Sequence, residues 1–337
     1  MPKTIYIDTP PDFSFRATIY SHGWCELHPF EIDEVNWRLS YVFSNGQGKA
    51  TPAVISEENG RIRIDLANTA IDTATIERTA RHLLRLDEDL APFYQTLDGH
   101  AGLEWISQQA AGRMLRSATV FEDLVKTICT TNCSWGLTKI MVTNLVEKLG
   151  SKSSPPYEGG VADASSDGVV LSSGGDQAKN HPPATAVPLR RKEGSRITFP
   201  TLNAFPTPAA MAAATEDFYR TEIKAGYRSP YFVELARAVV NGELDPESWL
   251  HSELSTADLK KEMKRVKGVG DYAAENLLKL VGRYDGLALD SWLRSQFYKK
   301  HNKQKPCKDT KIHRHYKKFA PYQGLAIWCD MTEKWIA

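Results

Sequence analysis

The residues with the clearest potential for chemistry lie between positions 255 and 290. Gly268-Val269-Gly270 joins two amphipathic segments, and Asp290 follows Gly270 by 20 residues, directly before a new helical pattern. Glycines are needed where a backbone turns sharply and must approach another group closely. Backbone amides at such a bend, with the N-terminus of the second helix, favour binding of a phosphate oxygen. The tripeptide therefore predicts a contact with a nucleic-acid backbone that reads no base sequence.

Two short helices must position this bend. Apolar residues recur at helical spacing before and after it, so each segment can bury one stripe. Ser255 is the expected N-cap of the first helix, and Asp271 the expected cap of the second. Five cations that favour an anionic partner crowd the approach to the bend: Lys260, Lys261, Lys264, Arg265 and Lys267. An ordinary helix connection can contain the same tripeptide, so the pattern alone leaves both interpretations open.

Charge is unevenly distributed along the 337-residue chain, although its formal net charge is only +1. Residues 1–100 contain 9 Lys and Arg against 15 Asp and Glu, whereas residues 257–320 contain 17 against 7. Such a basic segment is typical of a polyanion partner, although a solvated lysine-rich face gives the same count. No apolar run is long enough for a membrane span, and the first residues lack the apolar core of a secretory signal. We expect no membrane association and a cytoplasmic protein, or a nuclear one in a eukaryote.

Composition divides the chain into a β-rich start and a helical remainder. Aromatic and β-branched runs at 15–20 and 37–43 predict strands, and Asn59-Gly60 predicts a tight hairpin turn. From Ile71 onward the spacing becomes helical, as in Leu83, Leu86 and Leu90. We therefore expect an α+β protein, with an antiparallel sheet domain over 1–80 and a mainly helical core over 81–150 and 196–337. The Ser-, Gly- and Pro-rich stretch 151–195 predicts a disordered insertion.

The cysteines do not indicate a disulfide framework or a metal site. They are odd in number and scattered along the chain: Cys25, Cys129, Cys133, Cys307 and Cys329. An iron-sulfur cluster needs four clustered cysteines, and only two lie near the C-terminus. We expect no cluster and no resident metal.

An acidic residue at a helix start is usually just a cap, but the pairing of Asp290 with the glycine bend resembles the helix-hairpin-helix (HhH-GPD) DNA glycosylases. The resemblance is strongest to 8-oxoguanine DNA glycosylases and inducible 3-methyladenine DNA glycosylases, and it implies a two-lobed helical core. Segments similar to the family's occur in order at 83–97, 121–134, 199–215, 225–239 and 319–331. The 151–195 stretch departs from that pattern.

The resemblance also implies roles for individual residues. Asp290 matches the carboxylate that stabilises the sugar's developing positive charge and orients the attacking water, and it must be ionised to act. Asn132 matches a residue that reaches into the gap left by a flipped nucleotide, and Tyr227 with Arg228 match a pair that wedges into the stack. The alternatives are a helix cap for Asn132 and a half-buried core aromatic for Tyr227.

One departure concerns the mechanism. Two residues after the hairpin, where bifunctional relatives carry a Schiff-base lysine, this chain has Tyr272, and Lys267 precedes the hairpin. The expected activity is therefore monofunctional excision of a damaged purine from double-stranded DNA by a monomer. The alternatives are a non-catalytic DNA-binding module and a lyase that uses another lysine.

The damaged base and the residues that surround it stay open. Stacking suits alkylated bases, whereas an oxidised purine needs placed hydrogen-bond partners. The tryptophans Trp105, Trp135, Trp292 and Trp328 belong either to the base pocket or to the core. The resemblance also allows a monovalent cation on the hairpin carbonyls.

Overall fold

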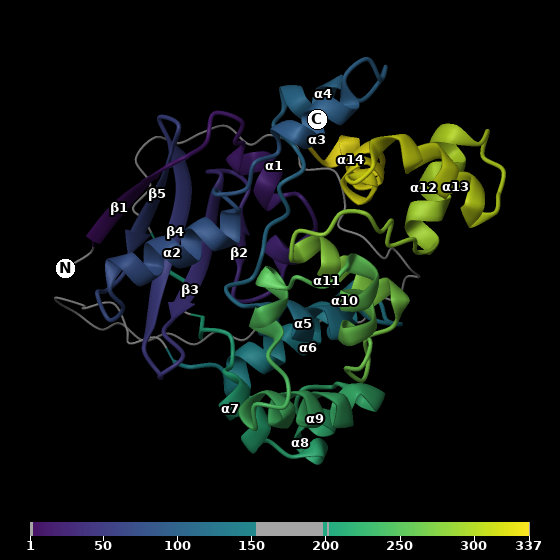
Figure 1. The fold of residues 1–337 in the computed structure, drawn as a ribbon. Coiled ribbons are helices and arrows are strands. Elements are labelled where there is room, and N and C mark those ends of the chain that lie inside the picture. The colour runs from purple at the N-terminus through teal and green to yellow at the C-terminus, as the bar shows by residue number, and fades with distance from the viewer. Residues whose placement is uncertain (1–2, 153–197, 201, 337) are drawn as a thin grey trace, which may run out of the picture.

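Figure 1 shows the protein as a computed structural model that describes residues 3–152, 198–200 and 202–336. Most of the predicted insertion at 151–195 lies outside the described residues. On either side of the gap, the Ala204 amide donates to the Ser151 carbonyl at 3.0 Å, so the two flanks lie side by side. Within the described ranges, no helix has the length and apolarity needed to cross a membrane.

Five antiparallel strands form the N-terminal sheet in the order β1-β5-β4-β3-β2. They are β1 (Lys3–Asp8), β2 (Glu31–Asp33), β3 (Arg38–Ser44), β4 (Ala50–Glu58) and β5 (Arg61–Leu66). The β4–β5 register places Ile55 opposite Ile64, both fully buried. Asn59 and Gly60 have φ of 52° and 72°, the positive values that a tight hairpin turn requires. The predicted sheet and hairpin are confirmed.

The predicted strand at 15–20 is wrong, because this segment forms helix α1 (Phe15–Ile19). The Ser14 side chain caps it by accepting from the Ala17 amide at 3.2 Å. Phe15 and Ile19 are four residues apart, and both are buried. The run has strand-like composition but helical spacing, and the spacing decides which side chains can share one buried face.

The rest of the described chain is helical. The α-helices are α2 (Thr73–Leu84), α3 (Ala91–Leu97), α4 (Glu104–Gln108), α5 (Val120–Thr130), α6 (Trp135–Leu149), α7 (Pro208–Ala213), α8 (Glu216–Thr221), α9 (Ser229–Val240), α10 (Thr256–Met263), α11 (Asp271–Leu280), α12 (Ser291–His301), α13 (Asp309–Tyr316) and α14 (Gln323–Ile336). Short 3₁₀ turns occur at η1 (Gly23–Glu26), η2 (Gly226–Arg228), η3 (Pro246–His251) and η4 (Lys317–Phe319). The expected α+β class is confirmed.

The helical spacing of Leu83, Leu86 and Leu90 does not correspond to one helix. α2 ends at Leu84, because Arg85 adopts a left-handed conformation with φ of 54°. Leu86 and Leu90 are nevertheless buried, in the irregular segment that follows. Burial recurs at these positions because the segment runs along the core, and not because the helix continues.

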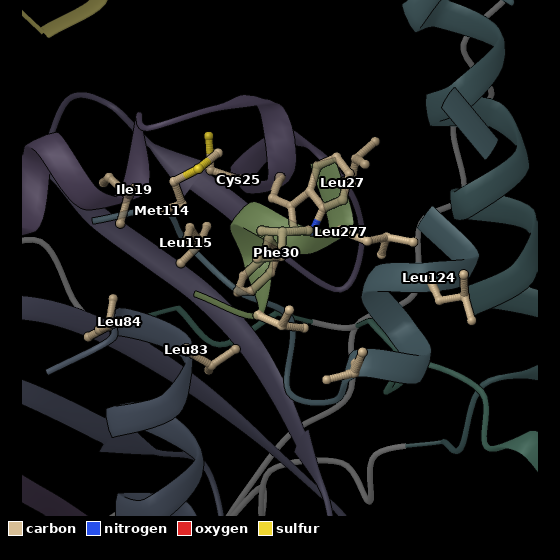
Figure 2. Packing of buried hydrophobic residues seen from close by; sticks show 14 of the residues in the cluster. Ile19, Cys25, Leu27, Phe30, Leu83, Leu84, Met114, Leu115, Leu124 and Leu277 are labelled. Atoms are coloured by element: carbon tan, nitrogen blue, oxygen red, sulfur yellow. The ribbon is translucent and has the colours of Figure 1, made fainter. Parts of the chain in front are cut away.

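One apolar cluster joins the sheet to the helices (Figure 2). Ile19 and Leu27 from the N-terminal segment belong to the same cluster as Leu83 of α2, Leu124 of α5 and Leu277 of α11. Because α11 follows the hairpin, this cluster links the N-terminal segment to an element of the predicted site. Packing is therefore continuous across residue 80, where the composition changes.

Candidate active site

A cavity of about 650 Å³ lies among segments that are far apart in the sequence. Its walls come from the N-terminal loop before and within η1, the α5–α6 turn, helix α11, the start of α12, and α14. The described residues that line it include His22, Gly23, Trp24, Met114, Asn132, Trp135, Tyr272, Asn276, Leu280, Asp290, Trp328 and Trp335. A concave, mainly apolar and aromatic site with a few polar groups is typical of a small-molecule or base pocket.

Asp290 is both a helix cap and a cavity residue. It occupies the N-cap of α12, where Oδ1 accepts from the Leu293 amide at 2.7 Å. The positive end of the helix dipole therefore lies directly at this carboxylate. The structure gives no other hydrogen bond to this carboxylate among the described residues, so Oδ2 is available to a substrate or a water. The cap and the predicted catalytic position are compatible with each other.

Tyr272 lies in the first turn of α11 and lines the same cavity. Although 37% of the Tyr272 surface is exposed, desolvation raises its pKa above the ordinary value, and the negative charge of Asp290 raises it further. The phenol therefore stays protonated and can donate a hydrogen bond. At this position the chain offers an aromatic ring and an O–H group, where an amine would be needed for Schiff-base chemistry.

The hairpin between α10 and α11 has the predicted geometry. Gly268 has a φ of +90°, and an added Cβ would lie 2.9 Å from the ring of Tyr231. Val269 is buried, and its amide donates to the Val266 carbonyl at 3.1 Å. Gly270 is the N-cap of α11, has an ordinary φ of −88°, and has open space where a Cβ would be. The fold requires Gly268, whereas Gly270 leaves the helix N-terminus accessible.

No side chain caps α11, so the expectation that Asp271 is its cap is wrong. Asp271 is instead the first helical residue, and its carboxylate accepts from Lys264 at 3.0 Å and contacts Lys260 at 3.2 Å. The first amides of a helix have no intrahelical acceptor. At α11 these donors remain for an external anion.

Most of the cations near the hairpin are paired with acidic side chains. Lys260 lies 2.6 Å from Glu275, Lys261 2.8 Å from Asp258, and Lys267 2.8 Å from Glu234. These exposed or half-exposed pairs cancel much of the charge that the sequence suggested. Backbone donors therefore carry more of the hairpin's attraction for an anion than the count of lysines implies.

The α5–α6 turn carries Asn132, which has a φ of 48° and lines the cavity. Asn132 does not cap the start of α6, because Ser134 occupies that position and accepts from the Leu137 amide at 3.3 Å. Tyr227 in η2 is 49% exposed, so it is not a core aromatic, and its hydroxyl donates to the Thr131 carbonyl at 3.3 Å. Both side chains are accessible beside this turn.

The structure does not place Arg228 where it could contact DNA. Its side chain is buried, and Nε donates to the Ile128 carbonyl at 3.1 Å. The guanidinium also donates to the Thr131 carbonyl and lies 4.4 Å from the Tyr227 ring. Arg228 therefore braces the end of α5 and supports Tyr227, because its donors satisfy carbonyls that the helix leaves free.

The sequence indicated only part of the cavity's aromatic lining. Trp135 and Trp328 line it, whereas Trp105 and Trp292 are absent from the lining residues. Trp24 and Trp335 line it as well, and no sequence pattern singled them out. They come from opposite ends of the chain, so their meeting is a consequence of tertiary packing.

The N-terminal loop contributes residues that sequence reasoning missed. An added Cβ at Gly23 would lie 2.5 Å from the Trp135 ring, so a glycine is needed for this close approach. His22 is buried, and burial lowers its pKa to about 3, which keeps the ring neutral. Its Nε2–H donates to the Leu115 carbonyl at 2.8 Å. His22 therefore shapes the wall without adding a charge.

A group of potential metal ligands also occurs among the described residues, at His301, His315 and Asp330. Asp330 is already held by Lys300 at 2.8 Å and by His301 at 2.7 Å, and it accepts from the Tyr316 hydroxyl. An ammonium beside the carboxylate opposes a second cation. We interpret this group as a hydrogen-bonded cluster that ties α12 to α14.

The fold is shared with solved DNA glycosylases. No family model and no curated protein matches the chain. The structure of MBOgg1 with a low-affinity DNA ligand has a TM-score of 0.69 at 17% identity, covering 98% of this chain and 95% of that one. Clostridium acetobutylicum 8-oxoguanine glycosylase/lyase has a TM-score of 0.67 at 17% identity, covering 98% and 97%. Archaeoglobus fulgidus 3-methyladenine DNA glycosylase has a TM-score of 0.66 at 15% identity, covering 98% of both chains. The chain therefore has the same fold as these solved DNA glycosylases.

Proposed function

We propose that this protein is a DNA N-glycosylase that flips a damaged purine out of double-stranded DNA and hydrolyses its N-glycosidic bond. The observation that carries the proposal is the position of Asp290, a helix-capping carboxylate that faces an aromatic cavity beside the glycine hairpin. The shared fold agrees with this activity, and one neighbour was crystallised with double-stranded DNA containing cytosine opposite 8-oxoguanine. Asp290 is the residue on which the chemistry depends.

In this proposal, DNA backbone and base bind to different parts of the site. The free amides at Gly270 and the start of α11 bind a phosphate oxygen. Asn132 and Tyr227 occupy the space that the extruded nucleotide leaves, which offsets part of the few kcal/mol that unstacking costs. The base enters the cavity among the tryptophans, and its sugar lies beside Asp290.

The chain's own residues favour hydrolysis over lyase chemistry. The Asp290 carboxylate stabilises positive charge on the sugar as the base leaves, and Oδ2 can orient the attacking water. Tyr272, which lines the cavity, can offer its hydroxyl as a hydrogen-bond donor but cannot form an imine. The product is then an abasic site in an uncut strand.

Base release from defined duplexes tests the proposal. Matched duplexes carrying 3-methyladenine, hypoxanthine or 8-oxoguanine are incubated with the protein, and each sample is split and analysed with and without alkali. The expected result is base release with strand cleavage only after alkali. Release of no base from any duplex would favour the alternative of a non-catalytic DNA-binding module.

A lyase that uses another lysine is tested in the same samples. Borohydride reduces an imine between the protein and an abasic site to a stable covalent adduct. We expect no adduct, and a trapped adduct would contradict the monofunctional assignment.

A further inference from the structure

Lys279, in the last turn of α11, is a buried cation that no hydrogen bond satisfies among the described residues. Its exposed fraction is 0%, and its Nζ has no hydrogen-bond partner in that part of the chain. Burying an unpaired ammonium is costly, and an apolar side chain would fill this space without the cost. Burial lowers the Lys279 pKa to about 8, while Glu275 and Asp290 oppose that shift. The side chain therefore remains mainly charged at neutral pH.

The ammonium lies behind the wall of the candidate base cavity. Lys279 is seven residues beyond Tyr272, which corresponds to about 10 Å along α11. Its helical neighbours Asn276 and Leu280 both line the cavity. Its Nζ lies 5.0 Å from the centroid of the Trp328 ring, another lining residue. The charge is thus separated from the cavity by a single layer of side chains.

The other ionisable groups around Lys279 leave this charge without a close partner. The His22 ring is neutral, and the positive charge of Lys279 is one cause of its lowered pKa. Burial raises the pKa of the Cys329 thiol to about 12, so it is neutral as well. The Arg85 guanidinium donates to the Lys279 carbonyl at 3.2 Å and is itself paired with Glu88 at 2.8 Å, so it offers Nζ no counter-charge. No acidic side chain comes within ion-pair distance of Nζ in the described chain.

On the basis of the proposed function, we propose that Lys279 determines specificity by selecting neutral purines and disfavouring cationic N-alkylpurines. Two effects act in the same direction. A positive charge in a poorly screened environment repels a second positive charge across the wall. The ammonium also makes a cation–π interaction with the Trp328 ring, and this interaction weakens the stacking of a cationic base on the same ring. A carbonyl oxygen on a neutral base gains from the same field.

Binding to lesion duplexes in an inactive background tests this inference. All proteins carry Asp290→Asn so that no base is released. Duplexes of one sequence contain guanine, 8-oxoguanine, hypoxanthine or cationic 7-methylguanine, the last with a 2′-fluoro sugar that prevents its spontaneous loss. Dissociation constants are measured for the background protein and with added Lys279→Met or Lys279→Arg. Lys299→Met, at an exposed position of α12, is the matched control for losing one positive charge elsewhere.

The expected readout is a change in preference between the two kinds of lesion. The background protein binds the neutral lesions more tightly than 7-methylguanine. Lys279→Met shifts the affinity ratio about tenfold toward 7-methylguanine, as a poorly screened charge at this range would. Lys279→Arg and Lys299→Met leave the ratio unchanged, because the first keeps the charge and the second acts equally on all duplexes.

Three results would overturn the inference. The first is a background protein that prefers 7-methylguanine, and the second is an unchanged ratio in a folded Lys279→Met protein. The third is a borohydride adduct that forms with the wild-type protein but not with the Lys279→Met variant. Such an adduct would show that Lys279 reacts with the sugar. If no lesion duplex binds more tightly than the guanine duplex, the proposed function itself fails, and this outcome differs from recognition of lesions without a charge preference.

Discussion

Helices α11 and α12 both begin at the candidate site, but their N-termini are used in different ways. α11 begins at Gly270 without a side-chain cap, so its first amides are free to bind an external group. α12 begins at Asp290, whose carboxylate accepts from the Leu293 amide. An open N-terminus can bind a phosphate, whereas a capped one fixes a carboxylate in place. The same helix property therefore serves binding in one case and chemistry in the other.

The charges along these helices differ in a similar way. The lysines of α10 and of the hairpin that follows it pair with acidic side chains such as Glu275 and Asp271. In the last turn of α12 and after it, the exposed lysines Lys299, Lys303, Lys305 and Lys308 have no ion pair within the described structure. A count of cations along the sequence treats both regions alike. The second region therefore leaves more of its charge available to a polyanion.

Removing the charge at the start of α12 should give the largest effect. Asp290→Asn should lower the rate of base release by about 10³-fold or more, because the carboxylate's charge is lost at the sugar. Asparagine is an equally good N-cap, so the melting temperature should stay close to that of the wild type. Single-turnover experiments measure the rate of base release, and DNA affinity measured in parallel shows whether binding is retained. Full activity in this variant would show that the carboxylate at the start of α12 takes no part in the chemistry.

At the other end of α11, Lys279→Met should increase stability. The folded pKa of about 8 lies below the ordinary 10.5, so below pH 8 the lysine is charged in both states and its burial costs about 3 kcal/mol. Between pH 8 and 10.5 the folded protein loses this proton first, and the cost disappears. Denaturant unfolding should show a gain for the variant at pH 7 that shrinks toward pH 10. An equal gain at both values would contradict a charged, buried Lys279.

The two hairpin glycines offer a matched comparison. Gly268→Ala should destabilise the fold by about 1–3 kcal/mol, because a side chain is strained at φ of +90° and its Cβ meets the Tyr231 ring. Gly270→Ala should leave the melting temperature unchanged, since its φ is ordinary and its surroundings are open. Its added methyl group should still weaken DNA binding at the free amides. Equal melting temperatures for both variants would show that the hairpin does not need its positive φ.

The smallest effect concerns salt dependence. Lys303→Met with Lys305→Met should reduce the slope of log affinity against log salt by about 1 for each phosphate that the protein no longer neutralises. Lys264→Met with Lys267→Met should change the slope less, because those ammonium groups already pair with Asp271 and Glu234. Titrations of an undamaged duplex at several salt concentrations measure both slopes. A larger change in slope for Lys264→Met with Lys267→Met would show that the lysines at the hairpin, and not those after α12, neutralise the phosphates.

Sequence reasoning succeeded where short-range physics decides the structure. The Asn59-Gly60 turn and the Ser255 cap depend on residues within a few positions of each other, and both are confirmed. It failed where burial depends on distant segments. The 15–20 run became helix because Phe15 and Ile19 share a buried face, and Arg228 became a core residue because the end of α5 needed its donors.

By itself, the sequence determined a β-rich start, two helices around a glycine bend, and an acid at the start of a third helix. These follow from periodicity, turn chemistry and capping, which act over a few residues. Only the tertiary structure brought His22 and Gly23 from the N-terminal segment against Trp135 and Trp328, and placed an unpaired Lys279 behind them. Such contacts join positions separated by about 50 to 300 residues, and their energies come from packing and desolvation that no local pattern encodes.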